Sequence, residues 1–255
     1  MLTNINVRGG SLNLKKLLKM VIPGISKLFV IYRLYIKYRK RLPRKFIIDS
    51  DRNLLYLNNP KVACSSIKIS MFGEQPDIHV FAGVYTEVEL DQETGRYYKF
   101  TFVRNPFKRL VSCFEDKCIQ HPDDICWDSY LFSSLLRVQD FSQFVRRVFL
   151  LPGCLDEPHF AGQYRLIYDK GDKCQVDFVG KVENIKEEYE PIRERFNLLP
   201  LAHTNRAASL TGKYWMDYYT PFTAWLVYRK YKKDFIAFGY EDEYTKLKEY
   251  LKGKK

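Results

Sequence analysis

The chain has 255 residues, 46% of them hydrophobic and 28% charged, and a formal net charge of +12. This length and composition exclude fibrous, collagen-like and wholly disordered proteins and fit one α/β domain or two small domains. Residues 1–45 hold twelve Lys and Arg and no acidic residue, whereas residues 46–255 hold 30 basic and 30 acidic residues. The excess charge belongs to the N-terminal segment, so it does not indicate a nucleic-acid-binding surface over the whole chain.

The basic segment contains an apolar stretch, residues 17–36, that is interrupted by Lys19, Lys27 and Arg33. These charges argue against a transmembrane helix, and no small-residue cleavage site follows as it would in a signal peptide. Interleaved apolar and cationic residues are typical of a helix that lies on an anionic membrane, on an acidic acceptor or on the protein's own body. We therefore predict a basic arm over 1–45 and a folded domain over 46–255.

Strands and helices are predicted to alternate along the folded part, which indicates an α/β fold. Residues 45–49 and 54–58 are predicted strands separated by a polar turn, and a loop of small residues then leads into a helix. The apolar run 97–103 predicts a strand that is buried on both faces. Asn105 precedes a proline and disfavours a helical backbone itself, whereas Pro106 suits the first turn of the next helix.

The second half of the chain continues the alternation. Residues 128–151 are predicted to be helical, with one apolar face made of Phe141, Phe144, Val145 and Val148. In the segment GKVEN we expect the glycine to serve packing and assign no catalytic role to Lys181 or Glu183. We predict a strand and a loop at 175–185, a charged helix at 186–197, and a closing helix with a tail at 221–240.

The segment PKVACSSIK, residues 60–68, places Lys61, Ser65 and Ser66 between a strand and a helix. Such a junction binds phosphate because the first helical turn offers unpaired N–H groups and the positive end of the helix dipole. On its own, the loop is more simply explained as a serine-rich turn that caps a helix. The phosphate-binding pattern GxxxxGK[ST] is absent.

The segment FVRNPFKRLVS, residues 102–112, ends a strand at Arg104 and places Ser112 two turns into the next helix. Backbone N–H groups and the arginine can hold a second anion there, and the alternative is an arginine that pairs with an acid. For Arg109 we predict the alternative, a side chain on the helix surface that is paired with an acid.

Together these segments resemble the PAPS-dependent sulfotransferases that act on carbohydrates, in the chondroitin, dermatan and HNK-1 branch. NPKVACSSIK is similar to the 5′-phosphosulfate loop of that family, and FTFVRNPFKRLVSCFEDK is similar to its 3′-phosphate loop. DEPHFAGQYRLI resembles the segment around a DEHW motif, and VDFVGKVENI and DFIAFGYE follow in the family's order. The resemblance covers most of residues 54–240 and implies a P-loop-like sulfotransferase fold, in which helices flank a central parallel sheet.

The resemblance implies that 3′-phosphoadenosine 5′-phosphosulfate (PAPS) is the sulfuryl donor, that 3′-phosphoadenosine 5′-phosphate (PAP) is the product, and that a glycan, polysaccharide or glycolipid is the acceptor. Two separate anion loops suit a nucleotide with phosphates at both ends of its ribose. Lys61 would also neutralise the leaving phosphate oxygen, and no metal is expected. The implied donor-binding residues are Lys61, Val62, Ala63, Cys64, Ser65, Ser66, Arg104, Ser112 and Asn205.

A base is needed to take the proton of the acceptor, and imidazole suits this role because its pKa lies near neutral pH. His159 lies in the DEHW-like segment, although Pro158 intrudes between the acid and the histidine and Phe160 replaces the tryptophan. His79 lies between the phosphate loops, where the related uronyl 2-O-sulfotransferases carry a catalytic histidine. Both are candidate bases, with Glu157 as a third, and for each histidine the alternative is a loop residue that is merely hydrogen-bonded.

Two other functions stay open at this level. One is an ATP- or GTP-dependent phosphotransferase, against which the missing GK[ST] pattern counts. The other is a non-catalytic basic protein that binds membranes or nucleic acid through the arm, although the neutral charge of the folded part makes a nucleic-acid partner unexpected. For an enzyme, the arm suggests peripheral contact with an anionic membrane.

The six cysteines form no CxxC pair, which argues against a disulfide scaffold and a zinc site. Buried thiols in a reducing cytosol are the favoured interpretation, and pairing in an oxidising compartment stays open. The start of the chain so near the catalytic region is typical of a bacterial cytoplasmic enzyme, at most peripheral at the inner membrane. Animal members of the family are Golgi membrane proteins, so a eukaryotic source would imply that compartment.

Overall fold

The folded part of the chain begins slightly earlier than the sequence predicts. The chain divides into two compact units, residues 1–41 and 42–255. Arg44 is buried and its Nε donates to the carbonyl of Leu166 at 3.1 Å, and Lys45 begins the first strand. The rest of the predicted arm lies outside the described residues. The computed structural model describes residues 44–83, 85–86, 92–120, 138, 140–151, 153, 156–201 and 211–254.

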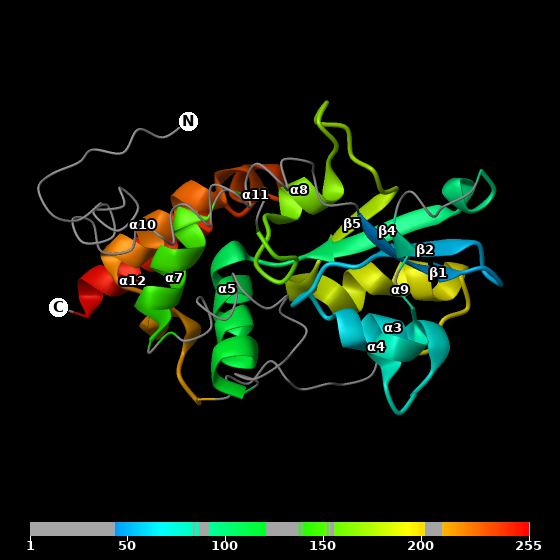
Figure 1. Cartoon of the computed structure of the whole chain (residues 1–255), viewed down its shortest axis with the longest axis horizontal. Helices are drawn as coiled ribbons and strands as arrows, with labels where there is room; N and C mark the ends of the chain where they lie inside the picture. Colours follow the sequence, from blue (N-terminus) through cyan, green and yellow to red (C-terminus); the bar gives the residue numbers. More distant parts are fainter. Residues whose placement is uncertain are drawn as a thin grey trace, which may run out of the picture. The chain divides into compact units, whose positions relative to one another are not determined.

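A five-stranded sheet in the order β3-β1-β2-β4-β5 forms the centre of the folded unit (Figure 1). β2 (Leu54–Leu57), β4 (Tyr98–Val103) and β5 (Phe178–Lys181) run parallel. β1 (Lys45–Asp49) pairs antiparallel with both β2 and β3 (Tyr85–Thr86). The predicted parallel sheet flanked by helices is therefore confirmed, and β1 and β3 extend it on one side through antiparallel pairings.

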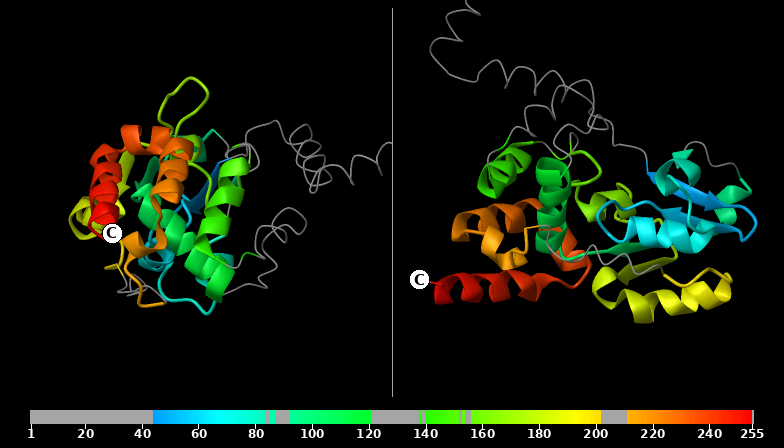
Figure 2. Two further views of the ribbon diagram at one scale, coloured as in Figure 1. Left: turned by 90° about the vertical axis from the view of Figure 1, so that its left-hand side faces the viewer. Right: turned by 90° about the horizontal axis from the view of Figure 1, so that it is seen from below.

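Both faces of the sheet are buried, and alternate residues of β2 pack into two different cores. On one face the sheet packs against α3 (Cys64–Phe72) and α9 (Ile185–Arg195). The helices of the other core gather at one end of the sheet, as Figure 1 and the right-hand view of Figure 2 show. They are α5 (Pro106–Phe114), α7 (Phe141–Leu150), α8 (Gln163–Ile167), α10 (Pro221–Lys230), α11 (Lys232–Ala237) and α12 (Glu241–Gly253).

The described helices follow most of the sequence predictions. In α7 the four predicted apolar residues are the buried ones, while residues 128–137 of the same predicted helix lie outside the described part of the chain. The closing helix and tail predicted over 221–240 are two helices, α10 and α11, and a further helix that was not predicted, α12, follows them and packs Leu247 into the core. None of the described helices is long and apolar enough to cross a bilayer.

Gly180 of β5 serves packing, as predicted. A Cβ atom at this position would lie 2.3 Å from the ring of Phe102 in the neighbouring strand β4, which is closer than any real contact. The small residue lets the two strands pair beside a buried phenylalanine. It thereby supports the carboxyl end of β4, where one of the predicted anion loops begins.

Candidate functional site

One cavity of about 2170 Å³ lies beyond the carboxyl ends of β2 and β4 and brings together most of the predicted site residues. Of the others, Val62 is fully buried in the core behind α3, so only its backbone is available to a ligand. Asn205 lies outside the described residues. The predicted residues that line the cavity are Lys61, Ala63, Cys64, Ser65, Ser66, His79, Arg104, Ser112, Glu157 and His159.

The loop between β2 and α3 has the backbone of an anion site. Lys61 and Ala63 adopt left-handed conformations, with φ of 67° and 52°. A left-handed backbone is uncommon in residues other than glycine, and it produces concave arrangements of N–H groups that bind anions. Ala63 is also the N-cap residue of α3, and no side chain caps this helix or places an acid in its first turn. The N-terminus of α3 is thus arranged to receive a negative group from outside the helix.

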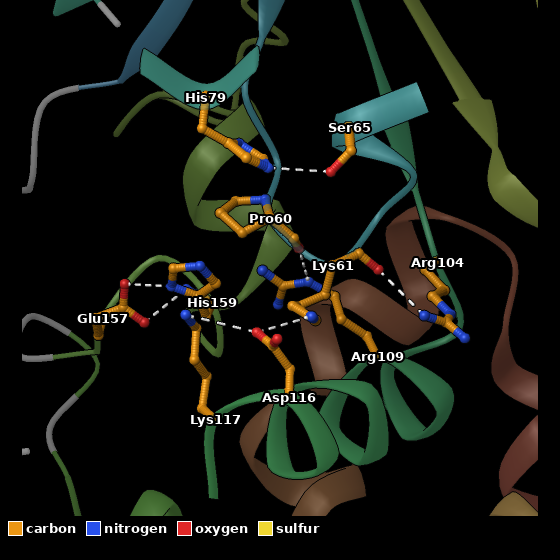
Figure 3. Close-up of polar contacts among 10 residues, drawn as sticks. All are labelled: Pro60, Lys61, Ser65, His79, Arg104, Arg109, Asp116, Lys117, Glu157 and His159. Carbon is orange, nitrogen blue, oxygen red and sulfur yellow. Dashed lines mark hydrogen bonds and ion pairs between the residues drawn. The ribbon is translucent and has the colours of Figure 1, made fainter. Parts of the chain in front are cut away.

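The loop between β4 and α5 is arranged differently. The side chain of Asn105 caps α5 by accepting from the N–H of Phe107 at 2.9 Å, and Pro106 occupies the first turn, as predicted. Arg104 donates through Nη1 to the carbonyl of Lys61 at 3.2 Å, which joins the two loops (Figure 3). Ser112 lies two turns further along α5 and lines the same cavity.

Arg104 forms no ion pair with a carboxylate of the described residues, so the acid-paired alternative does not hold for it there. Burial lowers the pKa of Arg104, and the nearby charge of Glu183 opposes this effect. A partly buried guanidinium that lacks a bound carboxylate carries a desolvation cost that an anionic ligand offsets. This is the environment expected of an arginine that receives a phosphate.

Gln163 connects the two loops, and the sequence patterns missed it. Its Oε1 accepts from the backbone N–H of Arg104 at 2.9 Å and from Nδ2 of Asn59 at 3.2 Å, and its Nε2 donates to the Arg104 carbonyl at 2.8 Å. The N–H of Gln163 is itself held by the buried carboxylate of Asp234 at 2.8 Å. Gln163 is fully buried, so these bonds fix the ends of β2 and β4 side by side.

The prediction for Arg109 is wrong. Its side chain is buried rather than exposed, and it donates to three backbone carbonyls rather than to an acid. Nε reaches the carbonyl of Pro60 at 3.1 Å, Nη1 that of Ala161 at 2.7 Å and Nη2 that of Pro158 at 2.8 Å. Arg109 therefore holds the first anion loop against the segment that carries His159.

Two charged residues of the cavity were also missed. Asp116 and Lys117 lie in η2 (Glu115–Gln120), a π-helical turn that continues α5. Oδ2 of Asp116 lies 3.1 Å from Nζ of Lys61 and 3.6 Å from Nζ of Lys117. Burial raises the pKa of Asp116, but the two lysines offset this, so the net shift is downward. The spacing of four residues from Ser112 was a signal that Asp116 faces the same side.

The two predicted histidines line the same cavity on one side of Lys61 (Figure 3). His79 lies in α4 (Ile78–Phe81), and its Nε2 is 3.1 Å from Oγ of Ser65. Nδ1 of His159 is 2.6 Å from Oε1 of Glu157, whose other oxygen accepts from the His159 N–H at 2.8 Å. Both imidazoles and the first anion loop thus border one space.

These donors fit a nucleotide with two separated phosphate groups. The first loop offers Lys61, two serines and an uncapped helix start to the cavity, and the second loop offers Arg104 and Ser112. Both sets are cationic or hydrogen-bond donors, which is the chemistry that phosphate and sulfate require. Among the described residues no three His, Cys, Asp or Glu side chains gather as a metal site would require. The four described cysteines, Cys64, Cys113, Cys118 and Cys174, are free thiols.

The chain is similar to known proteins over the region that forms this site. The profile of the sulfotransferase family matches residues 44–241. Carbohydrate sulfotransferase 12 of Xenopus laevis is 26% identical over 254 residues, which cover 76% of this chain and 59% of that protein. Carbohydrate sulfotransferase 11 of Mus musculus is 26% identical over 244 residues, covering 80% of this chain and 69% of that protein.

A shorter match has a higher sequence identity. Carbohydrate sulfotransferase 10 of Danio rerio is 46% identical over 37 residues, which are 14% of this chain and 10% of that protein. The chain spans about three fifths, 59%, of the length of the Xenopus laevis relative. No solved structure matches the chain. The family profile nevertheless covers the sheet, both anion loops and the histidines, and the chain belongs to the sulfotransferase family.

Proposed function

We propose that this chain is an enzyme that transfers a sulfuryl group from PAPS to a hydroxyl or amine of a carbohydrate. The observation that carries the proposal is the joining of two anion loops in one cavity, where Arg104 donates to the carbonyl of Lys61 at 3.2 Å. Membership of the sulfotransferase family supports the reaction, and the names of the relatives support a carbohydrate acceptor. The family match favours this function over a nucleotide-dependent phosphotransferase or a non-catalytic binding protein.

The residues of the two loops have separate tasks in this proposal. PAPS supplies a sulfuryl group bonded to a phosphate oxygen that is a good leaving group. Lys61 and the start of α3 bind the phosphosulfate end, and Lys61 offsets the negative charge that grows on the leaving oxygen. Arg104 and Ser112 bind the 3′-phosphate and so position the nucleotide. The histidines provide acid–base chemistry beside Lys61.

Binding of PAP tests the donor site directly. Arg104→Ala and Lys61→Ala should each weaken PAP binding roughly 10- to 100-fold in calorimetry, because each removes a charge-assisted contact of about 1.5–3 kcal/mol. Arg96→Ala is the matched control, since Arg96 is exposed and lies outside this cavity. Wild-type affinity in both loop variants would contradict the proposed donor site.

The choice of nucleotide separates the proposal from a phosphotransferase. PAP should raise the melting temperature of the protein, and ATP with Mg²⁺ should raise it far less, because ATP needs one extended phosphate site rather than two separate ones. A larger stabilisation by ATP with Mg²⁺ would favour the phosphotransferase.

Incubation with PAPS and a panel of glycans, followed by mass spectrometry for the gain of a sulfo group, identifies the acceptor.

The cellular location follows from the same proposal. The named relatives come from vertebrates, which supports the Golgi location implied by the family resemblance over the bacterial cytoplasm. The membrane contact predicted for residues 1–45 stays a prediction. Co-sedimentation with vesicles rich in phosphatidylserine tests it, using the full chain and a variant in which the Lys and Arg of residues 1–41 are replaced by Gln. Equal sedimentation of the two would contradict the prediction.

A further inference from the structure

The two histidines of the cavity face opposite kinds of hydrogen-bond partner. His79 has a lysine at one ring nitrogen, since Nζ of Lys68 lies 3.0 Å from its Nδ1, and Oγ of Ser65 lies 3.1 Å from its Nε2. His159 has a carboxylate at Nδ1, where Oε1 of Glu157 lies at 2.6 Å. Because a neutral imidazole carries one proton on its two nitrogens, these partners decide which nitrogen holds it.

Lys68 fixes the proton of His79 on Nε2. The ammonium group of Lys68 has three donors and no acceptor, so it donates to Nδ1 and this nitrogen accepts. Lys68 is 2% exposed, and no carboxylate of the described residues forms an ion pair with it, which leaves His79 as a partner that holds it in place. The proton on Nε2 then points toward Ser65 and the start of α3.

The surrounding charges keep His79 neutral. Burial lowers the pKa of His79 first, and the charges of Lys68, His159 and Lys117 lower it further. Asp77 opposes this effect, but its Oδ1 is already engaged by the N–H groups of His79 and Val80 at 3.0 and 3.1 Å. A neutral imidazole whose Nδ1 accepts from an ammonium has no lone pair at Nε2 with which to take a proton.

Glu157 produces the opposite tautomer in His159. A carboxylate only accepts, so Nδ1 of His159 donates to it and the lone pair of the neutral ring lies on Nε2. The same carboxylate stabilises the imidazolium that forms when Nε2 gains a proton. Asp116 of η2 and His79 of α4 also interact electrostatically with this ring.

We propose that His159 is the general base and that His79 donates a hydrogen bond to the group being transferred, because Glu157 and Lys68 hold the two imidazoles in opposite tautomers. The inference rests on the proposed sulfuryl transfer. Nε2 of His159 takes the proton of the acceptor hydroxyl while the acceptor oxygen bonds to sulfur. The sulfur–oxygen bond to the 5′-phosphate breaks, and its electron pair stays with the phosphate of PAP. Lys68 is a positioning residue that acts through His79.

Glutamine substitutions separate a donor from a base, because the glutamine amide donates a hydrogen bond near the position of Nε2 and cannot accept a proton at neutral pH. His79→Gln should regain part of the turnover lost in His79→Ala. His159→Gln and His159→Ala should both lose about 10²- to 10⁴-fold in kcat, with PAP affinity unchanged. The reverse pattern would overturn the assignment of roles.

The tautomers are measurable without turnover, so this half of the inference does not depend on the proposed function. In long-range ¹H–¹⁵N correlation spectra of the unliganded wild-type protein, His79 should carry its proton on Nε2 and His159 on Nδ1. A proton on Nδ1 of His79 would overturn the inference even in an active enzyme. Wild-type protein that neither binds PAP nor sulfates any acceptor would refute the proposed function while leaving the spectra as predicted.

Lys68→Met tests the positioning role with a side chain of similar length and no charge. Without the ammonium, the pKa of His79 should rise and its two tautomers should exchange, whereas the spectrum of His159 should keep its proton on Nδ1. Lys248→Met, at an exposed lysine of α12, is the matched control. An unchanged His79 signal in Lys68→Met would show that the lysine does not set the tautomer. If that variant does not fold, the wild-type spectrum still decides which nitrogen is protonated.

Discussion

The two predicted anion loops begin helices that border the same cavity, but they present hydrogen-bond donors by different means. The start of α3 has no side-chain cap and two left-handed residues, Lys61 and Ala63, so its backbone is exposed to a ligand. The start of α5 is capped by Asn105, whose N–H donates to Glu183 at 3.0 Å and whose Nδ2 donates to Glu243 at 2.6 Å. With the second helix start satisfied from within, anion binding there depends on the side chains of Arg104 and Ser112.

The backbone strain lies in the loop before α3, where Lys61 and Ala63 are left-handed, and not in the loop before α5. Left-handed backbone at a residue with a Cβ costs about 1–2 kcal/mol, and it persists where surrounding contacts enforce it. Arg109 supplies such a contact, since its Nε donates to the carbonyl of Pro60 beside Lys61. The backbone site is therefore maintained by a side chain that does not line the cavity.

Arg109→Met should have the largest effect and should damage the backbone site more than the side-chain site. It leaves three buried carbonyls without their donor, so we expect the free energy of unfolding to fall by at least about 3 kcal/mol. In the folded fraction, affinity for adenosine 5′-monophosphate should fall more than affinity for adenosine 3′-monophosphate. Urea denaturation and calorimetry measure both, with Arg229→Met, at an exposed arginine, as control. Equal loss of both affinities would contradict the proposed division.

Arg104→Lys tests the side-chain site with the charge retained. Lysine cannot reproduce the planar fork of donors, so we expect roughly 10-fold weaker binding of adenosine 3′-monophosphate. Binding of adenosine 5′-monophosphate should change by less than about twofold, because the first loop does not need the fork. A loss confined to the 5′-nucleotide would mean that the assignment of the two phosphates is inverted.

Asn105→Ala removes the cap of α5 and should lower the free energy of unfolding by about 1 kcal/mol or somewhat more. Asn105→Ser keeps a capping oxygen and loses the contact with Glu243, so it should recover part of this stability. Thermal or urea unfolding of the two variants measures the difference. Equal stability of the two would show that the cap itself contributes little at this helix.

Ala63→Gly should have the smallest effect and the opposite sign. Glycine adopts a φ of 52° without strain, so we expect the free energy of unfolding to rise by about 0.5 kcal/mol, after the entropy that glycine adds to the unfolded chain is counted. Ala224→Gly, in the middle of α10, should instead lower stability by about 1 kcal/mol. Destabilisation by both substitutions would show that Ala63 is not strained.

Sequence patterns were sufficient where a local rule decides the structure. Pro106 and the residue before it predict the start of α5, and apolar spacing predicts the buried face of α7, because both depend on neighbours within one or two turns. The two segments predicted to be anion loops could be recognised for the same reason. Each lies within a single strand–loop–helix segment whose residue types are adjacent in the chain.

The missed or misplaced residues act across long sequence separations. Arg109 resembles a surface residue of a helix, yet its three acceptors lie 49 to 52 residues away and are backbone carbonyls, which carry no side-chain signal. Gln163 meets Arg104 across 59 residues. Asp116 pairs with Lys61 across 55 residues, and its four-residue spacing from Ser112 was a local signal that the sequence analysis did not use.

Because of Gln163, the distance between the two loops and the affinity for the nucleotide should respond differently to salt. Its link between the ends of β2 and β4 consists of amide and backbone groups that do not titrate and that salt screens little. The proposed binding by Lys61 and Arg104, in contrast, depends on charge. Added salt should therefore weaken nucleotide binding without altering the distance between the two loops. The distance between the two loops should therefore stay constant as ionic strength changes, and only the affinity for the nucleotide should vary.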